Sequence, residues 1–176
     1  MSTPFRMVLM IAAFLALAAP KSFGQAPPVK AEVQRDWAAV KDTMMKIAAE
    51  MPEDKFGYKS TPAQRNYGEQ ILHVATANVG FLRALNGKAM PPDINAKATS
   101  KAEILKALSD SFDYGTALAA EQTPESMLQT VQARFLGDST RARVYYFLIG
   151  HAWDIYGQLA VYLRLNGLVP PASQRP

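Results

Sequence analysis

The chain has 176 residues, a formal net charge of +4 and no cysteine, and this length is sufficient for one domain with a buried core. The lack of cysteine excludes disulfides, thiolate catalysis and cysteine metal ligands. The positive charge does not indicate nucleic-acid binding, because no basic run is interleaved with aromatic residues.

The first segment is expected to be a signal peptide. Arg6 precedes a short apolar run over residues 7–19, which is followed by small residues and by Pro27 and Pro28. This run is shorter than the roughly 20 residues that span a bilayer. We therefore expect a signal peptide at 1–24, export to the periplasm or the medium, and no stable membrane insertion after cleavage. An uncleaved anchor is the alternative. Removing residues 1–24 leaves 17 basic and 15 acidic side chains, so the positive charge belongs largely to the precursor.

The first helix is predicted over residues 30–51, because apolar residues recur there at spacings of three and four. These residues are Val33, Trp37, Val40, Met44, Ala48 and Met51. Pro52 ends the helix. The following residues, 53–65, contain several turn formers and are expected to form a loop.

A second helix is predicted to begin at Asn66, because Glu69 three residues later completes a capping-box pattern. Its stripe of bulky residues contains Ile71, Val74, Asn78, Leu82 and Leu85. His73 lies nearly opposite this stripe. The line of the helix that carries His73 also carries Gln70, Ala77, Gly80 and Ala84. A polar head followed by small residues indicates a face that another helix approaches closely.

Ser100 and Glu103 repeat the capping-box pattern and predict a third helix. Its inward residues are expected to be Ile104, Leu108, Phe112, Gly115 and Leu118. Thr123 and Pro124 then predict a short helix that runs to about Phe135, since proline is tolerated at the first helical position.

The last helix is expected over residues 140–165, where Asn166 and Gly167 with two prolines beyond them predict its end. It is apolar along two lines. The first line holds Val144, Leu148, His151, Ile155, Gln158 and Tyr162, and the second holds Tyr145, Ile149, Trp153, Tyr156, Ala160 and Leu163. A helix that is apolar nearly all round is either central or shared with a partner. Burial within the chain and a homodimer interface are therefore both open.

Four substantial helices with short joins predict an all-α fold, an antiparallel four-helix bundle. We expect this bundle domain at 30–173, between a linker at 25–29 and a tail at 174–176. Neither an internal repeat nor the alternation typical of β-strands is visible.

Four segments, in their order and spacing, carry a family resemblance. They are MPEDKFGY at 51–58, YGEQILHVA at 67–75, YGQLAVYLRLNG at 156–167 and LVPPAS at 168–173. Over most of residues 30–173 the chain resembles the DinB-like superfamily, the DinB/YfiT-like metalloenzymes. The resemblance implies a four-helix bundle, commonly dimeric, with a divalent metal such as Zn or Ni held by three histidines. It also implies relatives that include thiol-dependent transferases and many members without a known activity.

By position, the resemblance matches the first metal ligand to His73 and the second to His151. The third ligand position, one helical turn after His151, is occupied by Ile155, which has no donor atom. Asp154 is the residue that could replace the missing ligand, and two histidines with one carboxylate form a known set for iron and zinc.

A site without metal is the alternative. Asp154 is then solvated or paired with an arginine, and the two histidines are ordinary core residues. The arginines available for Asp154 include Arg83 and Arg143, and the available partners of the imidazoles are Gln70, Gln158 and tyrosine hydroxyls.

Two functions follow from these patterns. Ile155 favours an exported DinB-like domain with a degenerate metal site, in which a divalent metal is absent or weakly bound. Such a domain would act as a small-molecule binding module or as a dimeric interaction module. His73 and His151 keep open a weakly metal-dependent hydrolase or transferase that acts on a small molecule. The expected partners are a second copy of the chain and an unidentified small molecule, without nucleic acid.

Overall fold

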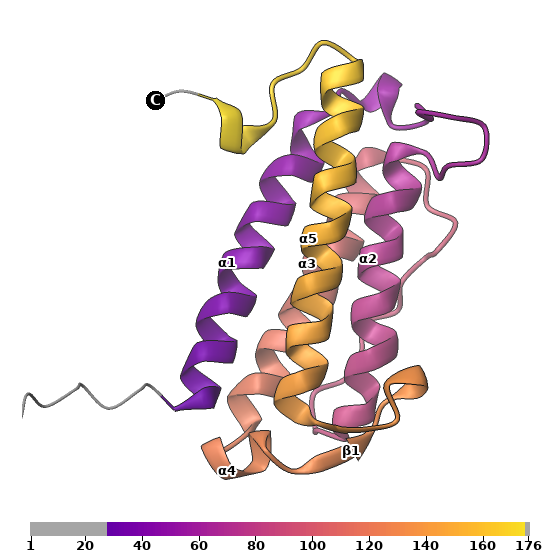
Figure 1. The fold of residues 1–176 in the computed structure, drawn as a ribbon. Coiled ribbons are helices and arrows are strands. Elements are labelled where there is room, and N and C mark those ends of the chain that lie inside the picture. The colour runs from indigo at the N-terminus through magenta and orange to yellow at the C-terminus, as the bar shows by residue number, and fades with distance from the viewer. Residues whose placement is uncertain (1–27, 175–176) are drawn as a thin grey trace, which may run out of the picture.

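The computed structural model describes residues 28–174, and four long helices lie side by side in it (Figure 1). They are α1 (Val29–Glu50), α2 (Tyr67–Leu82), α3 (Lys101–Glu121) and α5 (Arg141–Leu165). Each of them packs against two neighbours, in the cyclic order α1, α3, α2 and α5. The fold is therefore mostly helical, as the sequence predicts. The signal peptide expected at 1–24 lies outside the described residues.

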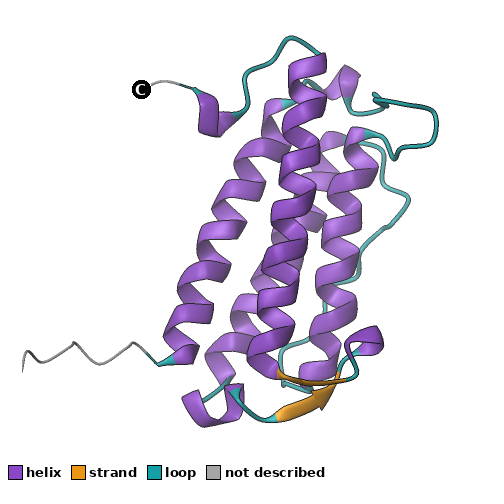
Figure 2. Cartoon of the chain, viewed as in Figure 1, coloured by secondary structure: helices purple, strands orange, loops and turns teal. Residues whose placement is uncertain are grey.

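Short elements occupy the connections between the long helices (Figure 2). The 3-10 turns are η1 (Glu53–Lys55), η2 (Arg83–Leu85), η3 (Arg134–Leu136) and η4 (Pro171–Ser173), and one short helix is α4 (Pro124–Met127). Two strands, β1 (Thr130–Gln132) and β2 (Asp138–Thr140), pair in antiparallel fashion. No helix among residues 28–174 is both long enough and apolar enough to cross a membrane.

The small hairpin corrects the sequence prediction for residues 123–135. The helix that starts after Thr123 was expected to continue to about Phe135, but it ends at Met127. Val131 instead pairs with Ser139 in the hairpin. The turn is closed by Gly137, whose φ of +62° is one that glycine adopts without strain.

The connection between α2 and α3 differs from the prediction, which expected short connections and antiparallel neighbours throughout. Residues 86–100 run back along the length of the helices (Figure 1). Pro91 and Pro92 lie in this segment and favour an extended backbone over a helix. Consequently α2 and α3 both start at the end of the molecule where α1 finishes, and these two neighbours run in the same direction.

Two lysines join the ends of α1 and α3. Lys30, at the start of α1, donates from Nζ to the carbonyl oxygens of Ala120 at 3.1 Å and Gln122 at 2.5 Å. Lys101, at the start of α3, donates to the carbonyls of Ala49 at 2.6 Å and Met51 at 2.8 Å. The last carbonyls of a helix have no partner within the helix, and a cation there is favourable. Each helix therefore caps the C-terminal end of the other.

The core is built around Trp37, which is 1% exposed. Its Nε1 donates to the carbonyl of Phe112 at 2.9 Å, and its ring centroid lies 4.8 Å from that of Phe112 and 5.3 Å from that of Tyr145. The hydroxyl of Tyr145 donates to the carbonyl of Gly115 at 2.7 Å. Glycine at 115 allows this packing, since a Cβ atom there would lie 2.6 Å from Cε2 of the indole.

The predicted capping box of α2 is confirmed. Asn66 Oδ1 accepts from the backbone N–H of Glu69 at 2.8 Å, and the Glu69 carboxylate accepts from the backbone N–H of Asn66 at 2.7 Å. Ser100 also caps α3, but the Glu103 carboxylate there accepts from the Ser100 hydroxyl at 2.8 Å. The box at Asn66 holds the Glu69 carboxylate at the start of α2, beside the candidate site.

Candidate functional site between helices α2 and α5

The two histidines of the chain meet across the contact between α2 and α5. The ring centroids of His73 and His151 are 4.9 Å apart, and their planes are perpendicular. Both side chains are partly buried. They are brought together because α2 starts where α5 ends, so that the middle of one helix lies against the middle of the other.

The other two sequence-predicted positions are not part of this pair. Ile155, one turn after His151, is buried at 3% exposure. Asp154 is exposed, and its Oδ2 accepts from Nε2 of Gln158 at 3.2 Å. Within residues 28–174 no three His, Cys, Asp or Glu side chains gather as a metal site requires. The structure therefore joins His73 with His151 but does not add Asp154 to them.

Gln70 and Gln158 link the two helices beside the histidines. Nε2 of Gln70 donates to Oε1 of Gln158 at 2.7 Å, and Gln158 in turn donates to Asp154. Both glutamines were possible partners of the imidazoles, but they bond to each other instead. Nε2 of His151 is buried and has no hydrogen-bond partner among the described residues. The pair is thus left with one unsatisfied polar atom, although most buried polar atoms in proteins have a partner.

Both histidines are held in the uncharged form at neutral pH. Burial lowers the pKa of His73, and the positive charge of Arg65 and the neighbouring His151 lower it further. Burial also lowers the pKa of His151, an effect that Asp154 opposes and Arg65 reinforces. Desolvation disfavours the charged imidazolium, and a nearby cation adds to this. The site is therefore a pair of neutral imidazoles whose protonation is disfavoured by burial and by the positive charge of Arg65.

Arg65 lines two cavities, one between α2 and the 86–100 segment and one between α2 and α5. One cavity, of about 380 Å³, is lined by Arg65, Glu69, Leu72, His73, Thr76 and Ala96. The other, of about 460 Å³, is lined by Ser60, Gln64, Arg65, Gln70, Gln158, Val161 and Tyr162. Arg65 was missed by the sequence analysis, because it lies in a loop and belongs to no periodic pattern.

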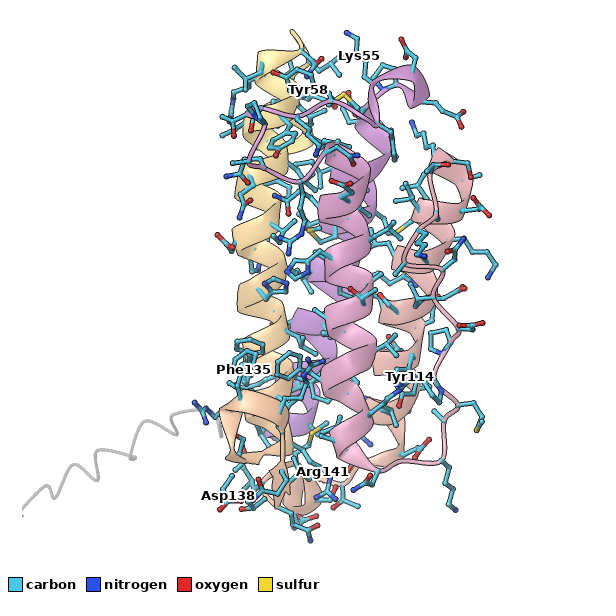
Figure 3. The ribbon with its side chains drawn as sticks, turned by 90° about the vertical axis from the view of Figure 1, so that its right-hand side faces the viewer. Lys55, Tyr58, Tyr114, Phe135, Asp138 and Arg141 are labelled. Atoms are coloured by element: carbon cyan, nitrogen blue, oxygen red, sulfur yellow. The ribbon has the colours of Figure 1, made fainter. Side chains whose placement is uncertain are left out.

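The backbone at Arg65 is fixed against α5. The hydroxyl of Tyr162 donates to the carbonyl of Arg65 at 2.6 Å. The ring of Tyr162 meets the edge of Tyr58 at a centroid distance of 6.0 Å, and Tyr58 lies near the upper end of the face in Figure 3. The loop that carries Arg65 is therefore anchored, although it has no regular secondary structure.

An aromatic cluster lies at the opposite end of the same face. Phe135 is 74% exposed, yet its ring makes edge contacts with Phe81 at 5.1 Å and Phe147 at 5.5 Å. Figure 3 shows Phe135 near the lower end of α5 and α2. The ring of Phe147 is parallel to that of His151 at a centroid distance of 6.4 Å. Apolar rings therefore extend from the histidines toward the hairpin.

Comparison with known protein families identifies the class of this mostly helical domain, which has a histidine pair between two of its long helices. The model of the DinB superfamily matches residues 20–159, which is most of the chain, and the protein belongs to this superfamily.

One solved structure to which the chain is similar is the crystal structure of a DinB-like protein from Bacillus cereus. The TM-score is 0.67 and the sequence identity is 18%, over 79% of this chain and 93% of the other. This similarity concerns the fold. None of the curated proteins compared with the chain matches it.

The three-histidine metal site that the resemblance implies does not fit the residues present. An open zinc site normally has three protein ligands. The position that would supply the third imidazole carries the buried, donorless side chain of Ile155, and the carboxylate that was expected to replace it, Asp154, accepts a hydrogen bond from Gln158. The two histidines alone provide two nitrogen ligands, so we derive no chemistry from a bound metal.

Proposed function

We propose that the protein is a DinB-superfamily domain that binds a small molecule on the α2–α5 face and has a degenerate metal site. The observation that carries this proposal is Ile155. Residues four apart on a helix lie on the same face, so Ile155 occupies the place from which a second imidazole of α5 would reach a metal beside His151. A buried isoleucine there leaves the site without its third ligand.

Binding of a small molecule is supported by what the site offers in place of a metal. His73, which is neutral because burial lowers its pKa, lines one cavity, and Gln70, whose buried Oε1 has no partner among the described residues, lines the other. The two cavities beside Arg65, of about 380 and 460 Å³, fall in the size range of small-molecule sites. Concave space next to unsatisfied polar groups is typical of ligand binding rather than of core packing.

The experiment is metal analysis of the purified protein beside two variants, Ile155→His and Ile155→Leu. We expect the parent and Ile155→Leu to hold far less than one equivalent of Zn or Ni. Ile155→His should bind close to one equivalent, because it restores the three-histidine set. Circular dichroism checks that this buried substitution leaves the helices intact.

The parent protein decides the test even if Ile155→His fails to fold. One equivalent of metal in the parent, lost in His73→Ala, would contradict the degenerate site. It would favour the metal-dependent hydrolase or transferase instead.

We further propose that the four long helices form the four-helix bundle of the family, with one long crossover at 86–100. We also propose that the protein is exported after cleavage of residues 1–24. The basic Arg6, the apolar run at 7–19 and the small residues after it support the second proposal. Intact-mass measurement of protein secreted from its host tests it, and a mass that retains Met1 would contradict it.

A second candidate function, homodimerisation, is favoured by the outward face of α5. Tyr146, Trp153 and Val161 are 39%, 47% and 50% exposed, and nothing lies within 4 Å of a Cβ atom placed on Gly150 or Gly157. Along this face a glycine and then a large residue follow Trp153 in each direction, Gly150 and Tyr146 on one side and Gly157 and Val161 on the other. A second copy related by a two-fold axis could therefore pack its α5 antiparallel against this one, as an isologous interface requires.

Sedimentation velocity tests the dimer with Trp153→Glu and the control Leu128→Glu. Leu128 is 61% exposed and lies outside α5. We expect the parent and the control to sediment as dimers and Trp153→Glu as a folded monomer. A monomeric parent would refute the proposal.

A further inference from the structure

The cavity of about 460 Å³ has one cation and no carboxylate among its lining residues. Arg65 supplies the positive charge, and the remaining polar lining groups, Ser60, Gln64, Gln70, Gln158 and the Tyr162 hydroxyl, are neutral. The guanidinium of Arg65 makes no ion pair or hydrogen bond with the described residues, whereas its backbone carbonyl is held by Tyr162 at 2.6 Å. Arg65 is exposed and only its backbone is held in place, so its unpaired guanidinium at the edge of the cavity is available to an anionic group.

Two acids close to the histidine pair, Glu69 and Asp154, are engaged with other partners than Arg65. The carboxylate of Glu69 accepts from the backbone N–H of Asn66 in the capping box. The carboxylate of Asp154 accepts from the amide of Gln158. Neither is paired with Arg65, so its charge is not neutralised within the described structure. Both acids nevertheless contribute negative charge close by, and this makes the surroundings unfavourable for a doubly charged anion such as phosphate.

One side of the cavity suits an apolar group, because Val161 and the ring of Tyr162 line it. The amide of Gln70, which is 1% exposed, lines the cavity too, and its buried Oε1 has no partner among the described residues, so it could accept a hydrogen bond from the body of a ligand. A carboxylate matches the planar fork of a guanidinium in two parallel hydrogen bonds. Its single negative charge balances the charge of Arg65, the one cation among the described residues that line this cavity.

We propose that the small molecule bound on the α2–α5 face is a monoanionic carboxylate with an apolar or aromatic body. Its carboxylate binds to the guanidinium of Arg65, and its body lies in the cavity beside Val161 and Tyr162. This proposal rests on the proposed binding function and specifies its ligand class.

Calorimetric titration tests it with four probes on the mature protein. Benzoate and 3-phenylpropionate carry one negative charge, benzamide has the shape of benzoate without the charge, and phenyl phosphate carries up to two charges. We expect benzoate or 3-phenylpropionate to bind and benzamide and phenyl phosphate to bind at least tenfold more weakly. Arg65→Gln should weaken carboxylate binding roughly 10- to 100-fold, as expected for loss of a charged hydrogen-bond pair. The control Arg83→Gln changes an exposed arginine at the other end of α2 and should leave binding unchanged.

Proton NMR of the imidazoles locates the ligand, because His73 and His151 are the only histidines in the chain. The carboxylate should shift their signals in the parent and not in Arg65→Gln. Benzamide bound as tightly as benzoate, or benzoate bound equally well by Arg65→Gln, would overturn the carboxylate assignment while leaving a binding function standing. Failure of both carboxylates to bind with a Kd below about 10 mM would also overturn it. A stoichiometric metal in the parent would instead overturn the proposed function.

Discussion

Substitution of Gly115 by alanine should destabilise the protein, although alanine is the better helix former. A Cβ atom at position 115 would lie 2.6 Å from Cε2 and 2.8 Å from Nε1 of Trp37. The indole has little room to retreat, because it packs between Phe112 and Tyr145 and donates to the carbonyl of Phe112. The methyl group therefore has to displace either the indole or the backbone of α3.

The size of the effect follows from three contributions. Overpacking a core costs about 1–3 kcal/mol. Loss or distortion of the indole hydrogen bond costs about 1 kcal/mol. Replacing glycine by alanine within a helix returns about 1 kcal/mol. We expect Gly115→Ala to lower the free energy of unfolding by about 1–3 kcal/mol, with a fall in melting temperature of roughly 2–4 °C for each kcal/mol.

Urea unfolding followed by circular dichroism measures this change. Gly150→Ala, within α5, is the matched control and should be stabilising, because no atom lies within 4 Å of a Cβ atom at that position. A smaller ring at position 37 should relieve the clash, so the cost of Gly115→Ala should shrink in a Trp37→Phe background. The reasoning is refuted if Gly115→Ala is as stable as the parent, or if its cost is the same in both backgrounds.

Three further predictions concern pH, α5 and the helix ends. Folding lowers the pKa of His73 and His151, so just below the ordinary pKa near 6.5 the unfolded chain binds more protons than the folded chain. The free energy of unfolding should therefore be highest above pH 6.5 and should fall as the pH drops from there toward the lowered pKa values of the folded state. Chemical denaturation at a series of pH values should find this dependence reduced in the double variant His73→Gln/His151→Gln. Gly150→Ala and Gly157→Ala should each stabilise the isolated chain by about 1 kcal/mol, because no atom stands in the way, while weakening the proposed dimer in sedimentation; tighter dimers would contradict the interface. Lys101→Met should lower the unfolding free energy by about 1 kcal/mol through loss of its bonds to the end of α1, and an unchanged value would show that these bonds contribute nothing.

The helices were predictable because their signals are local. Pro52 and the Asn66 capping box mark the end of α1 and the start of α2 within a residue or two. Apolar spacing also identified the inward residues, since Trp37 and Leu108 are buried as expected. In each case one face of a helix and its ends contain the required information.

The departures from the prediction depend on contacts between distant segments. The strands at 130–132 and 138–140 are too short to show an alternating pattern, and each is stabilised by the other. The return of residues 86–100 along the helices is not encoded by their own periodicity. The family resemblance paired His73 with His151, and their 4.9 Å separation follows from the antiparallel packing of α2 and α5.

The place of Arg65 in the candidate site could not be predicted from the sequence for a further reason. A loop arginine between turn formers is normally solvated, and its role depends on the hydrogen bond from Tyr162 and on the two cavities beside it. The glutamine pair was likewise assigned to the wrong partners. Gln70 lies one turn before His73 and Gln158 lies two turns after His151, and the antiparallel register of α2 and α5 brings the two amides together.

The reciprocal lysines Lys30 and Lys101 fix the position of α1 relative to α3 along the helix axes. A slip of one turn, about 5.4 Å, would carry Lys30 away from Ala120 and Lys101 away from Met51 at the same time. An apolar stripe by itself tolerates such a slip, because it repeats with every turn of the helix. The two lysines do not repeat. They therefore select one register from several that the hydrophobic core alone would accept. Because α3 packs against α2, this register also fixes where along the bundle axis α3 contacts the helix that carries His73.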